Sequence, residues 1–146
     1  MEWVALVTWV LTAGGGFAML ALWLKHGGMK DSELPGDRIR SARILGHFAL
    51  AATGLVVWVV YLATDSEGLA WVAFALLAVV AVLGFAMLAV WLRQRSREPA
   101  VAGPAGAVSD ATPAEQHFPP AIVGLHGLLA ATTLVLVLLV AAGVGD

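Results

Sequence analysis

Four long apolar stretches, separated by short polar segments, divide the chain. Each lacks Asp, Glu, Lys and Arg throughout, and they run over Trp3 to Leu24, Ile44 to Thr64, Gly68 to Leu92 and Phe118 to Gly145. Each reaches the roughly 20 residues that a helix needs to cross the hydrocarbon core of a bilayer. The pattern predicts an all-α four-helix transmembrane bundle, with residues 1–146 forming a single membrane domain.

Composition agrees with this prediction. The chain is 60% hydrophobic and 12% charged, with a mean hydropathy of +0.89, and these values are typical of membrane proteins. It contains no cysteine, which excludes disulfides and thiolate metal sites. The first apolar stretch has no basic residue before it and is longer than a signal peptide requires, so we expect it to remain in the mature protein.

Two pairs of segments repeat within the chain. Residues 16–25 return as 84–93, at an offset of 68, and the histidine segment starting at His47 returns at His126, at an offset of 79. Each histidine is followed four positions later by Ala-Ala-Thr. We interpret the sequence as a tandem duplication of a two-helix unit, with repeat 1 over residues 1–66 and repeat 2 over 67–146. The second offset is larger because the linker before the fourth helix is longer.

The charged residues predict the orientation in the membrane. All basic residues lie in the first loop or after the third helix: Lys25, Lys30, Arg38, Arg40, Arg43, Arg93, Arg95 and Arg97. The turn between the second and third helices carries Asp65 and Glu67 and no basic residue. The positive-inside rule then predicts a multi-pass protein of the plasma membrane, with both basic loops in the cytoplasm and both termini outside. Residues 94–117, rich in Ala, Pro and Gly, are expected to be a mobile cytoplasmic linker.

The two repeated histidines are the main candidate functional residues. The second helix is expected to begin near Ser41 and the fourth near Pro119 or Pro120, which places each imidazole roughly 9–10 Å below the cytoplasmic edge. A polar ring in hydrocarbon needs a partner, and ionisable residues at such depth are functional candidates. Helices related by the repeat lie diagonally across a bundle, so we expect His47 and His126 to face each other over its axis.

A haem b with two axial histidine ligands fits this arrangement, because neutral imidazole nitrogens bind haem iron well. Small and adaptable residues at the same depth would pack against the macrocycle, and Arg43 would pair with a propionate. The expected cofactor-binding residues are His47, His126, Met19, Met87, Gly16, Gly84, Ala51, Ala130 and Arg43, with His47 and His126 as the metal ligands. Such an iron has no open position, which favours electron transfer over catalysis.

The layout of four helices with paired histidines resembles the small four-helix membrane cytochromes b, in which histidines from two helices ligate haem. The resemblance implies an electron-transfer subunit of an oxidoreductase, working with a quinone or a redox partner subunit, in a lipid bilayer and without nucleic acid. Cytochromes of this class commonly hold two haems. The outer half of this chain has no histidine, so the resemblance here implies a single haem and another carrier.

Three alternatives remain open from the residues alone. His47 and His126 could be structural, hydrogen-bonded to hydroxyl groups or backbone carbonyls. With Met19 and Met87 they could form a two-histidine, two-methionine copper site, because thioether and imidazole ligands favour Cu(I). A transport or accessory role is compatible with the repeats, although the helices contain no intramembrane carboxylate or basic residue. A homo-oligomer is compatible with each of them. His26 and His117 are expected to be solvated loop residues.

Overall fold

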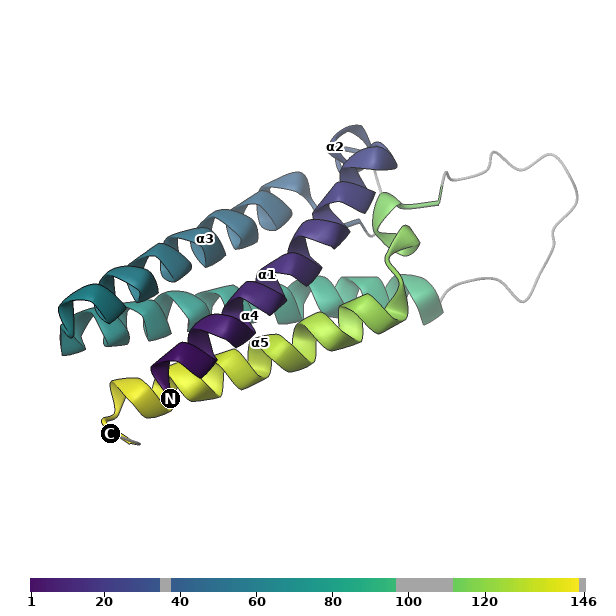
Figure 1. Cartoon of the computed structure of the whole chain (residues 1–146). Coiled ribbons are helices and arrows are strands. Elements are labelled where there is room, and N and C mark those ends of the chain that lie inside the picture. Colours follow the sequence, from purple (N-terminus) through teal and green to yellow (C-terminus); the bar gives the residue numbers. More distant parts are fainter. Residues whose placement is uncertain (35–37, 97–111, 145–146) are drawn as a thin grey trace, which may run out of the picture.

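Four long helices form a bundle in the computed structural model, which describes residues 1–34, 38–96 and 112–144 (Figure 1). They are α1 (Glu2–Lys25), α3 (Ser41–Thr64), α4 (Glu67–Ser96) and α5 (Pro120–Ala141). A short helix α2 (Gly28–Asp31) and a 3-10 turn η1 (Ala114–His117) connect them. All four long helices are long and apolar enough to cross a membrane, so the prediction of an all-α membrane bundle is confirmed.

The helix boundaries follow the sequence signals closely. α3 begins at Ser41 and α5 at Pro120, as expected, and proline suits a first helical position because its missing N–H has no partner there anyway. α3 ends at Asp65, whose φ of 51° reverses the chain into α4. α4 runs past the apolar stretch to Ser96, and Arg93 and Arg95 in its last turn favour the negative end of the helix dipole.

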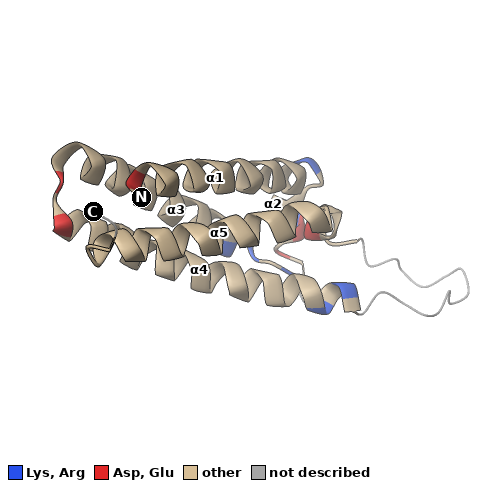
Figure 2. Ribbon diagram, turned by 60° about the horizontal axis from the view of Figure 1, so that its bottom comes forward, with Lys and Arg blue, Asp and Glu red and all other residues tan. Residues whose placement is uncertain are grey.

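Charged residues lie at the two ends of the bundle and leave its middle uncharged (Figure 2). We call the end holding Lys25, Arg93 and Arg95 the basic end, and the end holding Glu2 and Glu67 the acidic end. Both chain termini lie at the acidic end (Figure 1). The structure therefore has the segregation of charge that the sequence predicts along the four spans.

The neighbours in the bundle are set by contact between the helices. α1 packs most extensively on α5 and α3 on α4, α4 also contacts α5, and α1 and α3 contact each other least. Going round the bundle the order is thus α1, α3, α4 and α5. The two histidine-bearing helices, α3 and α5, are diagonal to each other as the repeats predict.

A tightly packed core fills the acidic half of the bundle. Its centre is Trp9 from α1 and Trp58 from α3, whose ring centroids are 6.4 Å apart. Trp58 is completely buried, and small buried residues, Ala5 and Ala73, make room for the two indoles. Burying aromatic side chains contributes a large share of core packing. This core lies between the histidines and an open pocket at the acidic end, which is lined by Glu2, Tyr61, Asp65 and Trp71 among others.

Candidate functional site

The two predicted ligands lie opposite each other inside the bundle. His47 comes from the second turn of α3 and His126 from the second turn of α5. Their ring centroids are 6.4 Å apart and their planes are tilted by 54°. The expectation that these histidines face each other across the axis is confirmed, and the separation leaves no direct hydrogen bond between the rings.

Each imidazole is held by a backbone carbonyl of the neighbouring helix. His47 Nδ1 donates to the Val80 carbonyl of α4 at 3.0 Å, and His126 Nδ1 donates to the Thr12 carbonyl of α1 at 2.9 Å. A carbonyl oxygen only accepts, so the hydrogen of each neutral ring sits on Nδ1. The other nitrogen, Nε2, then carries a free lone pair, which is the form in which histidine binds metals.

The two carbonyl acceptors, like the two histidines, occupy equivalent positions in the two repeats. Thr12 and Val80 are 68 positions apart, the offset that relates the rest of α1 to α4. Sequence analysis did not identify them, because a carbonyl acceptor requires no particular side chain. The one sequence signal that relates the two acceptors is the 68-residue offset between α1 and α4, the helices on which the histidine-bearing helices pack.

Glycines allow each ring to approach its neighbouring helix. A Cβ added at Gly84 would lie 3.3 Å from His47 Cε1, and one added at Gly16 would lie 3.3 Å from His126 Cε1. Contacts this short are tighter than most side chains tolerate, so glycine keeps both rings unstrained. Both predicted glycines therefore contact the predicted ligands, and again the two contacts are equivalent under the repeat.

Each long helix has a stretch around the histidines that contributes no buried residue, in contrast to the acidic half. Buried side chains are absent from residues 10–22 of α1, 41–53 of α3, 81–89 of α4 and 120–132 of α5, all within the described part of the chain. Every helix contributes buried residues on the acidic side of this level. Protein interiors are normally close-packed. The two half-buried imidazoles lie within these stretches, beside small residues.

The remaining predicted site residues flank this level. Ala51 and Ala130 follow the histidines by one helical turn and are half-buried, as is Met19. Met87 is half-buried and packs against a small cluster of Ile39, Val90 and Trp91 toward the basic end. Arg43 lies one turn before His47, half-buried, and its side chain forms no hydrogen bond or ion pair with any described residue.

The spacing of the imidazoles can be compared with that of two ligands sharing one metal ion. An imidazole nitrogen binds a metal at about 2.0–2.1 Å and the ring centroid lies about 1.2 Å behind it, so two rings on opposite sides have centroids roughly 6.4–6.6 Å apart. The observed separation is 6.4 Å. By this distance alone, the two imidazoles leave room for one metal ion between them.

No family model, curated protein or solved structure matches this chain. The candidate site is therefore judged on its geometry alone. Among the described residues no group of three or more His, Cys, Asp and Glu side chains is placed to hold a metal ion. An ion held by the two histidines would need its other ligands from a cofactor or from different side chains.

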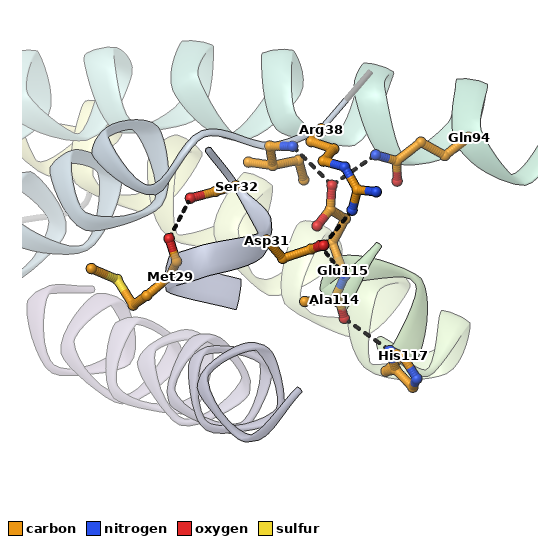
Figure 3. A network of polar contacts seen from close by, with 9 residues as sticks. Met29, Asp31, Ser32, Arg38, Gln94, Ala114, Glu115 and His117 are labelled. Carbon is orange, nitrogen blue, oxygen red and sulfur yellow. Dashed lines mark hydrogen bonds and ion pairs between the residues drawn. The ribbon is translucent and has the colours of Figure 1, made fainter. Parts of the chain in front are cut away.

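A network of polar contacts, here called the cap, closes the basic end (Figure 3). Glu115 of η1 is 1% exposed, and its Oε1 accepts hydrogen bonds from the Ile39 backbone N–H at 2.8 Å and from Gln94 Nε2 at 2.7 Å. Asp31 pairs with Arg38 and also accepts from the Ala114 N–H at 2.9 Å. The cap ties together segments from α2, α4, η1 and the chain before α3.

Both ends of the predicted mobile linker, residues 94–117, form regular structure. Residues 94–96 belong to α4 and 114–117 form η1, while 97–111 lie outside the described residues.

The two histidines outside the candidate site also make a contact that the sequence did not predict. His26 and His117, predicted as solvated, are exposed but stack on each other with ring centroids 3.7 Å apart, joining the end of α1 to η1.

Proposed function

We propose that this protein is a membrane cytochrome that binds one haem b through Nε2 of His47 and Nε2 of His126. The single observation that carries the proposal is the matched pair of imidazoles, each with Nδ1 on a repeat-related carbonyl and centroids 6.4 Å apart. The porphyrin would supply the remaining four ligands of the iron. Bound there, haem supplies a one-electron redox couple.

The chain's own residues would bind and orient this group. Gly16 and Gly84 would keep space beside the rings, and the half-buried Arg43, one turn nearer the basic end, would pair with a propionate carboxylate. The Thr12 and Val80 carbonyls would fix the tautomer and the orientation of each imidazole. Since His47 and His126 would both ligate the iron, the function we propose is electron transfer or redox sensing.

We also propose an orientation of the bundle in the membrane and the kind of redox partner it has. The basic end faces the cytoplasm, both termini lie outside the plasma membrane, and residues 1–66 and 67–146 are products of a tandem duplication. Electrons would pass to or from a membrane quinone or a redox partner subunit, because one haem on one side of the bilayer does not span it. This chain would then act as an electron-transfer subunit, alone or as a homo-oligomer.

The structural alternative for the histidines makes a different prediction. The carbonyl hydrogen bonds alone would satisfy buried structural histidines, but such a role uses only Nδ1. An asparagine amide can donate from nearly the same position as Nδ1 and has no atom at Nε2. A His47→Asn variant therefore keeps the structural bond and removes the proposed ligand. The copper alternative is less favoured, because Met87 packs into the cluster at the basic end.

The test is an absorption spectrum of the purified protein in detergent, oxidised and then reduced with dithionite. We expect a strong Soret band and sharp reduced α and β bands, typical of a low-spin haem. His47→Asn and His126→Asn should lose most of the haem, while His26→Ala, at the exposed stack, retains it. A colourless protein after haem is supplied during expression would overturn the proposal, and copper in metal analysis of that protein would support the alternative.

A further inference from the structure

The histidine level is closed along the axis of the bundle in both directions. On the acidic side, Trp9 and Trp58 fill the core with side chains that are 3% and 0% exposed. On the basic side, the buried Glu115 and the Asp31–Arg38 pair hold the cap in place. A rigid planar ligand would have to displace one of these closely packed layers to enter along the axis. Entry between two helices, from the side, requires less disruption.

The seam between α1 and α3 is the weakest side wall. These helices contact each other less than any other neighbouring pair of long helices. At the histidine level the seam is bridged by Phe17 and Phe48, an edge-to-face pair with ring centroids 5.2 Å apart. Phe17 directly follows Gly16, and Phe48 directly follows His47. Both phenylalanines are exposed on the surface of the bundle, at 56% and 37%.

The repeat-related seam between α4 and α5 is built differently. Phe85 corresponds to Phe17, but Gly127 stands where Phe48 does, and Phe85 is 68% exposed. No aromatic pair bridges this seam, and the two helices pack more extensively on each other instead. The α4–α5 side of the site is thus closed by helix packing. The α1–α3 side is closed by two phenylalanine side chains, which can rotate without moving a helix.

We infer that the α1–α3 seam is the entry route for the ligand of the histidine site, that Phe17 and Phe48 form its gate, and that the ligand enters from the lipid bilayer. This inference rests on the proposed function, and the ligand is a flat, largely apolar macrocycle such as haem. Aromatic rings at the surface of a transmembrane bundle exchange contacts with each other for contacts with acyl chains at little cost. Opening this gate leaves the packed core and the cap intact.

The test uses the absence of cysteine from the chain. A Phe17→Cys, Phe48→Cys double variant in vesicles is joined by a short reducible thiol cross-linker, and haemin dissolved in the same vesicles is followed by growth of the Soret band. We expect cross-linking to block uptake and reduction to restore it. The matched control is the Phe85→Cys, Gly127→Cys variant, whose cross-linked α4–α5 seam should leave the rate unchanged.

A second pair of variants tests the gate without cross-linking. Phe48→Ala should speed haem uptake roughly two- to tenfold, the range expected from losing one aromatic pair, whereas Phe85→Ala should not change it. Equal rates in both variants, or uptake through the cross-linked α1–α3 seam, would overturn the route. Haem content at equilibrium tests the proposed function separately. If haem binds but its uptake rate is the same in all these variants, only the gate is refuted. If haem never binds, the proposed function is refuted.

Discussion

Glycine is the residue type on which the geometry of each imidazole depends most directly. Gly84 and Gly16 leave 3.3 Å between an added Cβ and the Cε1 atom of a ring, so any larger side chain would push that ring away from its carbonyl acceptor. Gly14, also in α1, has nothing within 4 Å of an added Cβ and provides a control. The three positions have similar helical surroundings but differ in what a side chain would meet.

We therefore predict that Gly84→Leu weakens haem binding while Gly14→Leu does not. Overpacking a close contact costs about 1–3 kcal/mol, which corresponds to roughly five- to 150-fold in affinity. The measurement is a titration of haemin into the apoprotein in detergent, followed at the Soret band. If Gly14→Leu and Gly84→Leu weaken binding equally, the effect comes from helix packing in general and not from the ring contact.

At the scale of secondary structure, the long helices were predictable and the short elements were not. α3 and α5 begin where Ser41 and the Pro119-Pro120 pair indicated, because charge, proline and apolar length act locally. η1 and α2 depend on contacts between distant parts of the chain. The carboxylate of Glu115 accepts a hydrogen bond from an N–H 76 residues away, and that of Asp31 in α2 accepts one from an N–H 83 residues away. No local pattern encodes such pairings.

Glu115 gives the prediction at this scale. Replacing it with alanine removes the acceptor shared by the buried Ile39 N–H and the half-buried Gln94 amide. Hydrogen bonds to charged groups contribute about 1.5–3 kcal/mol each, but only the Ile39 bond is fully buried. We therefore expect Glu115→Ala to lower the free energy of unfolding by about 2–4 kcal/mol. Thermal unfolding in one detergent measures it. Glu33→Ala, at an exposed position, is the control and should unfold at the wild-type temperature.

At the scale of the whole molecule, the charges at the two ends lead to a test of orientation. Single cysteines at exposed positions can be introduced without interference, since the chain has none. Ser66→Cys, in the turn at the acidic end, should react with a membrane-impermeant maleimide in intact cells. Glu33→Cys, after α2 at the basic end, should react only after permeabilisation. The opposite pattern would reverse the proposed orientation of the whole bundle.

The number of haems follows from how differently the two halves of the bundle are packed. The sequence predicts no ligand in the half away from the histidines, and the structure adds that the core is packed there: Trp9, Trp58, Leu77 and Val137 are each at most 6% exposed. A second macrocycle would have to displace this core, whereas His47 and His126 lie in stretches of α3 and α5 that contribute no buried residue. We therefore expect one haem per chain, measured as haem absorbance in alkaline pyridine against protein from amino-acid analysis. Two haems per chain would require the tryptophan core to open, and half a haem per chain would mean that two copies share one site through only one histidine each. Either ratio would contradict a site built inside a single bundle from His47 and His126.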